Sequence, residues 1–186
     1  MGFSLLLGSA SFPIGNAAKA QPAPQVAPAK PGHVVTVTAY NAVPGQTDDT
    51  PFETASGAYS NPEVVAARSG NLAGEMPFGT IIELDGSTVL AEGTCGIKAV
   101  SSRIGYRVIA DTMNPRYADR IDVLFDTEAN HARADGTVIN AANVLGICKG
   151  VTARVVGRID IRRMPKTQAE LAVLVNGSTE KALALR

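Results

Sequence analysis

The chain has 186 residues, 45% of them hydrophobic, so it can bury one sizeable core but has little length for a second domain. Lysine plus arginine (17) balance aspartate plus glutamate (17), and the charges are scattered, which excludes an obvious basic face for nucleic acid or an anionic membrane. The 18 glycines and 11 prolines, set among short runs rich in valine and isoleucine, favour a mainly β fold.

The N-terminal part of the sequence resembles a processing region. In residues 1–20 an apolar block, Phe3 to Leu7, is followed by small residues, in the manner of a secretory signal; an ordinary tail is the alternative. The block is far shorter than the ~20 residues that cross a bilayer. Residues 21–32 are rich in proline and alanine and predict an extended linker. We therefore expect an exported protein of the periplasm, envelope or extracellular space, with no stable membrane span in the mature chain.

Alternating or continuous apolar runs predict the strands of a domain over residues 33–161. The expected strands are His33–Tyr40, Val64–Ala67, Ile81–Leu84, Tyr106–Ala110, Arg120–Phe125 and Val151–Ile161. Asp85-Gly86 is a hairpin signal before a further strand at Thr88–Ala91. Gly57 suits a left-handed turn, and Gly157 suits a β-bulge in the closing strand.

The remaining segments are less regular. Residues Glu92–Arg103 are expected to form a hairpin excursion, and Thr127–Asp135 a short helix with Thr127 as N-cap. Val138–Ile147 is ambiguous between helix and strand. The tail, residues 162–186, contains one expected helix, Gln168–Val175.

Cys95 and Cys148 are the only cysteines. In an exported protein such a pair usually forms a disulfide, and this is our prediction. A catalytic thiol assisted by His131 or His33 is the alternative, but neither cysteine has a recognisable nucleophile context.

Two aspartates stand out because each touches a predicted strand. Asp111 follows the run Tyr106–Ala110, and Asp122 lies within Arg120–Phe125. The segment between them contains Asn114-Pro115, a turn signal. We therefore expect both carboxyl groups to lie close together at the ends of neighbouring strands.

The order of these motifs resembles a known family. Thr38-Ala39-Tyr40, Thr54-Ala55-Ser56-Gly57, Pro77-Phe78-Gly79-Thr80, Asp111-Thr112 and Arg120-Ile121-Asp122 occur in the order seen in the bacterial 3D (three-aspartate) domain, and the two aspartates keep its spacing. That family is similar to the C-terminal part of membrane-bound lytic transglycosylase A and belongs with the RlpA-like double-psi β-barrels. The resemblance covers residues 34–159.

The resemblance implies a mainly β fold: a six-stranded double-psi β-barrel with short helices and a C-terminal extension. We expect seven apolar side chains mainly inside it: Ile81, Val108, Ile121, Val123, Phe125, Val155 and Ile159. Closure of the barrel would remove exposed sheet edges.

The resemblance also implies a cell-wall enzyme that cleaves peptidoglycan glycan strands without a cofactor, leaving a 1,6-anhydro ring. Asp111 and Asp122 are then the catalytic acid and base, with Asp111 the more important, because such chemistry needs a carboxyl group with a raised pKa. Glycan is expected to contact the groove wall at Tyr40, Thr54, Ser56, Thr112 and Asn114. Tyr40 has two possible roles: its ring packs on the core, as is more usual for a strand aromatic, or stacks on a sugar at the barrel rim.

One difference from the family favours a second function. Where the family has its first aspartate, this chain has Arg68, and a cation near Asp111 would lower the pKa of that carboxyl group. The alternative is therefore a non-catalytic barrel that binds wall glycan or serves as an extracellular structural or assembly protein. No metal site is expected, because Asp126, Glu128 and His131 match no known ligand spacing.

Overall fold

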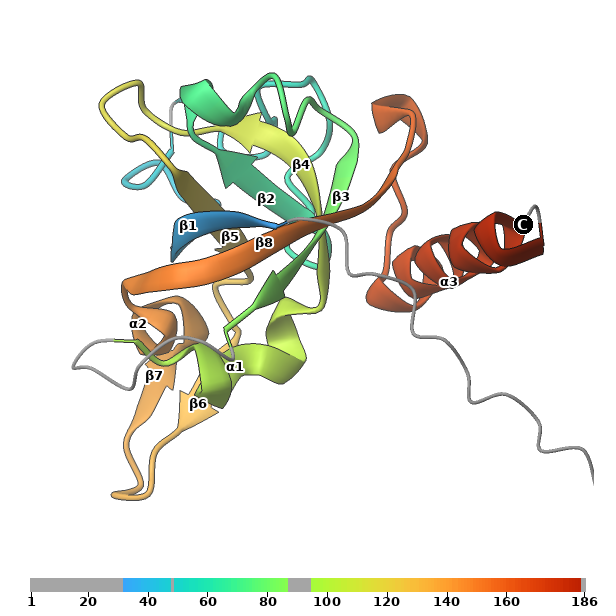
Figure 1. Ribbon diagram of the computed structural model, residues 1–186. Helices are drawn as coiled ribbons and strands as arrows, with labels where there is room; N and C mark the ends of the chain where they lie inside the picture. The colour runs from blue at the N-terminus through green and yellow to red at the C-terminus, as the bar shows by residue number, and fades with distance from the viewer. Residues whose placement is uncertain (1–31, 48, 87–94, 185–186) are drawn as a thin grey trace, which may run out of the picture.

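The computed structural model describes residues 32–47, 49–86 and 95–184, and these residues form a mainly β structure (Figure 1). Six strands close into a barrel in the order β1-β5-β2-β4-β3-β8, and β6 and β7 form a separate two-stranded sheet. The strands are β1 His33–Asn41, β2 Val65–Arg68, β3 Thr80–Asp85, β4 Tyr106–Thr112, β5 Arg120–Phe125, β6 Asn130–Ala132, β7 Val138–Asn140 and β8 Cys148–Arg158. The helices are α1 Ile97–Ile104, α2 Ala141–Leu145 and α3 Gln168–Ala184, with 3-10 turns at Gly70–Leu72 and Ile161–Arg163. The closed barrel with short helices is therefore confirmed.

The strand pairing has an internal two-fold symmetry. β1 runs parallel to β5 and β2 runs parallel to β4, whereas β2–β5, β3–β4, β3–β8 and β1–β8 are antiparallel. Exchanging β1, β2 and β3 with β4, β5 and β8 leaves this pattern unchanged. The parallel pairs place the carboxyl ends of β1 and β4 where loops leave the barrel, and the candidate site lies there.

The apolar side chains gather in two clusters, each drawn from several barrel strands. The first contains Ile121, Val123 and Phe125 with α1 and α2, and the second contains Ile81 and Val108 with Leu171 and Val175 of α3. Val155 and Ile159 are partly buried against the first and second clusters respectively. Five of the seven residues predicted inside are thus buried and two are partly buried. They divide between the two clusters, because Ile81, Val108 and Ile159 belong to the one that includes residues of α3.

The predicted bulge at Gly157 is confirmed. Ile81 pairs with Gly157 and the next residue, Ile82, pairs with Val155, so β8 carries one extra residue at this point. A Cβ atom added to Gly157 would lie 3.2 Å from the Cδ1 atom of Ile81, and the close approach of the two strands therefore favours glycine. Gly57 has a φ of 79°, as its predicted left-handed turn requires.

Two segments differ from the sequence-based expectation, and a third cannot be compared with it. Thr127–Asp135 is not a helix: Asn130–Ala132 pairs with Val138–Asn140 as a hairpin, because the segment has no apolar face at helical spacing and cross-strand pairing satisfies its backbone. Ile97–Ile104, assigned to a hairpin excursion, is helix α1, whose Ile97, Val100 and Ile104 are buried at helical spacing. The strand expected at Thr88–Ala91 lies outside the described residues.

The structure shows which elements form in the segment Val138–Ile147, which the sequence left ambiguous between helix and strand. Residues 138–147 contain both alternatives, since β7 ends at Asn140 and α2 begins at Ala141. The Asn140 side chain caps α2 by accepting a hydrogen bond from the Ala142 amide. Helix α3 begins at Gln168 as predicted but extends to Ala184. Among the described residues, no helix is both long enough and apolar enough to cross a membrane.

The predicted disulfide is confirmed. Cys95 and Cys148 are bonded, with their Cα atoms 4.7 Å apart, and Cys148 is fully buried. The bond joins the residue two positions before α1 to the first residue of β8. It therefore encloses β4 and β5, the two strands that carry Asp111 and Asp122.

Candidate functional site

A groove of about 890 Å³ lies at the carboxyl ends of β1 and β4. Its walls come from the loop after β1, the loop after β4, and single residues of β2 and β5. The lining includes Tyr40, Gln46, Thr47, Glu53, Thr54, Ala55, Ala67, Asp111, Thr112, Asn114, Arg116, Tyr117 and Asp122. The groove thus brings together both predicted catalytic aspartates and four of the five predicted glycan-contacting residues.

Asp111 is held by three hydrogen-bond donors. Its Oδ1 atom accepts from the backbone amides of Ala55 at 2.9 Å and Thr112 at 2.8 Å. Its Oδ2 atom accepts from the Tyr40 hydroxyl at 3.1 Å. Donors directed at both oxygens fix the orientation of the Asp111 carboxyl group in the groove.

Asp122 lies in a different environment. Its pKa is raised from 3.8 to about 6, chiefly because its carboxyl group is buried and to a smaller extent because of the charge on Asp111. Opposing this, the Thr38 hydroxyl donates to Oδ1 at 2.8 Å and the positive charge of Arg120 acts in the same direction, so both lower the pKa. Because the raising effects prevail, Asp122 is the carboxyl group that can carry a proton near neutral pH.

The two aspartates are not on neighbouring strands, contrary to the expectation. Strand β2 lies between β4 and β5, and its Ala67 is in register with both Asp111 and Asp122. Asp122 is also the third residue of β5 rather than its end. The turn signal at Asn114-Pro115 suggested a direct connection, but a four-residue strand from earlier in the chain pairs between the two. The methyl side chain of Ala67 leaves the space between the carboxyl groups open. No sequence pattern predicted this role of Ala67.

Of the four polar residues other than Tyr40 that were predicted to contact glycan, three line the groove and one does not. Thr54, Thr112 and Asn114 line the groove. Ser56 does not: it lines a second cavity on the other side of the hairpin at residues 53–59, and its Oγ atom lies 2.9 Å from Thr54 Oγ1. The positive φ at Gly57 turns the chain here, which carries Ser56 away from the groove.

Tyr40 lines the groove but is not an exposed platform. Only 7% of the residue is accessible, and its ring packs in the second apolar cluster while its hydroxyl holds Asp111. Burial raises its pKa well above the ordinary value, with further increases from the charge of Asp111 and the hydrogen bond to it, so it remains a neutral donor. Of the two roles considered for Tyr40, packing on the core is the one observed, since β1 directs this ring into the second apolar cluster.

Tyr117 is the more accessible aromatic of the groove, and the sequence analysis missed it. The guanidinium carbons of Arg116 and Arg120 lie 4.8 and 4.6 Å from the centre of its ring. Arg116 also donates a hydrogen bond to the Tyr117 hydroxyl at 2.9 Å. These contacts fix the ring at the groove wall. Arg116 and Tyr117 directly follow the Asn114-Pro115 turn in the sequence, and this pattern could have indicated an aromatic residue at the groove.

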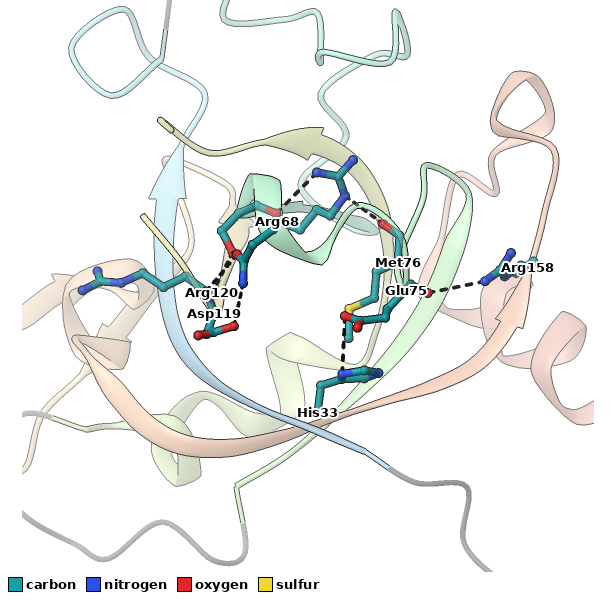
Figure 2. A network of polar contacts seen from close by, with 9 residues as sticks. His33, Arg68, Glu75, Met76, Asp119, Arg120 and Arg158 are labelled. Carbon is teal, nitrogen blue, oxygen red and sulfur yellow. Dashed lines mark hydrogen bonds and ion pairs between the residues drawn. The ribbon is translucent and has the colours of Figure 1, made fainter. Parts of the chain in front are cut away.

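Among the described residues Arg68 forms no ion pair with Asp111 or Asp122. Figure 2 shows its side chain bonded to Met76 instead. Its Nε atom donates to the Met76 carbonyl at 2.8 Å, its Nη1 atom contacts the Ser69 carbonyl at 3.4 Å, and its guanidinium lies 5.2 Å from the centre of the Phe78 ring. The side chain therefore supports the loop between β2 and β3. Arg68 is not among the charges that shift the pKa of Asp122.

Metal binding finds no support among the described residues, which contain no group of three histidine, cysteine or acidic side chains arranged to hold an ion. Asp126 instead accepts a hydrogen bond from the Glu128 amide at 2.8 Å, which stabilises the turn before β6. Glu128 is exposed, and His131 lies within β6.

Comparison with protein families and with curated proteins finds no match for this chain. The groove holds two carboxyl groups in a polar cleft, one of them with a raised pKa, an arrangement suited to general acid and base catalysis.

Proposed function

We propose that this chain is an exported cell-wall protein that cleaves peptidoglycan glycan strands in the manner of a lytic transglycosylase, with Asp122 as general acid and base. The observation that carries the proposal is the pair of carboxyl groups in one groove, one with its pKa raised to about 6 and the other held by three donors. The motifs that resemble the 3D domain and lytic transglycosylase A point to the same reaction.

The two carboxyl groups take separate roles in this mechanism. Protonated Asp122 donates its proton to the glycosidic oxygen as the bond to the muramic acid C1 atom breaks. The anionic Asp111 stabilises the positive charge that develops on the sugar. The oxygen of the C6 hydroxyl group then bonds to C1 and closes the anhydro ring, while Asp122, now a carboxylate, accepts the proton of that hydroxyl group. Asp122 is thereby protonated again, and no water is consumed.

Export of the protein is part of this proposal. The disulfide between Cys95 and Cys148 is a bond typical of oxidising compartments, where peptidoglycan is found. The signal-like character of residues 1–20 and the linker-like composition of residues 21–32 agree with that location. The residues that line the groove all lie after these two segments.

The decisive experiment is incubation of the purified full chain with peptidoglycan sacculi, followed by mass spectrometry of the soluble products. Anhydro-muropeptides are expected from the wild type. We expect Asp122→Asn to reduce their release by at least about a hundredfold, within the usual contribution of a general acid. Asp135→Asn, which changes an exposed carboxyl group in the β6–β7 turn, is the matched control and should retain full activity. Release of products with ordinary reducing ends would indicate a hydrolase instead.

A second function is favoured by one specific observation, the arginine at the position of the family's first aspartate. On this alternative the barrel binds wall glycan, or serves as an extracellular structural or assembly protein, without cleaving it. Sedimentation of the chain with sacculi and no soluble product from the wild type would establish the binding function and refute the catalytic one.

A further inference from the structure

A second cavity of about 520 Å³ lies on the far side of the hairpin that forms one groove wall. It is bounded by the hairpin residues Ser56 to Tyr59 and by the segment that follows β8 and leads to α3. Its apolar surface comes from Met164, Pro165 and the ring of Tyr59. Tyr59 is 64% exposed, whereas the residues beside it in the hairpin form backbone hydrogen bonds.

The charged residues that line this cavity are both basic. Arg162 and Lys166 line it, and no acidic residue does. Arg162 is already engaged, since its guanidinium forms two hydrogen bonds with Asp160. Within the described part of the chain, the Lys166 ammonium makes no ion pair. The cavity therefore combines a small apolar surface, an exposed aromatic ring and an uncompensated cation, which suits an anionic ligand with small apolar groups.

The hairpin at residues 53–59 contributes lining residues to both the groove and the second cavity. Thr54 lines the groove, Ser56 lines the cavity, and their hydroxyl oxygens are 2.9 Å apart. The backbone of this hairpin is anchored to β4 by the hydrogen bond from the Ser56 amide to the Ala110 carbonyl, at 3.2 Å. A ligand that lies in the groove and carries a side branch can therefore pass over a short, fixed hairpin to reach the cavity.

We propose that this cavity binds the acidic stem peptide attached to the glycan in the groove. The inference rests on the proposed function and adds a part of the substrate to it. Stem peptides alternate small apolar residues with residues that bear free carboxylates, and these match the apolar surface beside Met164 and Pro165 and the ammonium of Lys166. The Tyr59 ring packs against the peptide backbone, and the Asn61 side chain stays bonded to the Lys166 carbonyl, which fixes the cavity wall.

The test compares two substrates, glycan strands that carry stem peptides and strands from which an amidase has removed them. Binding is measured by co-sedimentation and cleavage by mass spectrometry, with the full chain. We expect tighter binding and faster cleavage of peptide-bearing strands. Lys166→Gln should reduce this preference about two- to fivefold, the range of a single exposed charge contact, without changing activity on bare strands. Tyr59→Ala should reduce it further.

Two matched variants serve as controls. Arg163→Gln removes an exposed cation three residues from Lys166 that does not line the cavity, and Phe52→Ala removes a second aromatic residue that is also 64% exposed. Both should leave the preference unchanged. Equal binding and cleavage of the two substrates would overturn the inference while leaving the proposed enzyme intact. Preferential binding of peptide-bearing strands without any cleavage would support the cavity and refute the catalytic proposal.

Discussion

Asp111 and Asp122 are separated by one strand and are both in register with the same residue, Ala67 of β2. Ala67 is 3% exposed and lines the groove between the two carboxyl groups. Its small side chain thus leaves room for a substrate atom to meet both acids.

The first prediction concerns this space. Ala67→Val adds two methyl groups between the carboxyl groups and should reduce release of soluble products from sacculi at least tenfold, with a loss of about 1 kcal/mol in unfolding free energy from overpacking. Ala66→Val is the control, because Ala66 is fully buried in the other cluster and does not line the groove. It should lower stability and leave turnover by the folded fraction unchanged. Full activity of the Ala67 variant would show that substrate does not enter here.

The second prediction tests Tyr40 as a positioning residue. Tyr40→Phe keeps the buried ring but removes the hydroxyl that donates to Asp111 Oδ2. We expect a loss of about 1 kcal/mol in stability, measured by urea unfolding, and a lower rate of sacculus cleavage. Tyr106→Phe is the control, since no hydrogen bond of the Tyr106 hydroxyl is found in the described residues. Equal loss in both variants would remove any special role for Tyr40.

The third prediction follows from the raised pKa of Asp122. The folded-state pKa of about 6 exceeds the unfolded value of 3.8, so the folded state binds the proton more tightly between these pH values. The stabilising effect of this proton is fully present below pH 3.8 and is lost as pH rises through 6. The shift of roughly two units corresponds to at most about 3 kcal/mol.

Urea unfolding from pH 4 to pH 8 measures this effect. Asp122→Asn should abolish the decline in unfolding free energy that Asp122 causes as pH rises. The variant should be more stable than the wild type above pH 6, although inactive. A parallel decline in the variant would contradict the assignment. In kinetic measurements, Thr38→Val should move the alkaline loss of activity to higher pH, because the Thr38 hydroxyl lowers the Asp122 pKa.

The fourth prediction separates Arg68 from the groove. Arg68→Met removes the hydrogen bonds to the Met76 and Ser69 carbonyls and should cost about 1–3 kcal/mol in thermal or urea unfolding. Turnover by the folded protein should not change, because Arg68 does not line the groove. An altered pH profile of cleavage would instead mean that its charge acts on the aspartates.

The fifth prediction concerns the disulfide. The bonded cysteines are 53 positions apart, and replacing both with alanine should lower the unfolding free energy by about 4 kcal/mol in the chain-entropy model. Reduction of the wild type with dithiothreitol should produce a similar loss. A variant as stable as the oxidised wild type would show that the loop is constrained by other contacts.

The amino-acid sequence by itself determined the element types wherever the local apolar pattern was clear. Arg120–Phe125 was predicted with its observed bounds, β1 to within one residue, and the bulge at Gly157 and the pairing of Cys95 with Cys148 also followed from local or compositional signals. The pattern failed where a short segment lacked a periodic apolar face, as in the β6–β7 hairpin.

Only the tertiary structure decided how the site works. The placement of β2 between β4 and β5, the burial of Tyr40 and the raised pKa of Asp122 all depend on residues distant in sequence. The reason is physical: local periodicity specifies which face of a strand is apolar, whereas the protonation of a carboxyl group is set by the burial and the charges that the whole fold assembles around it.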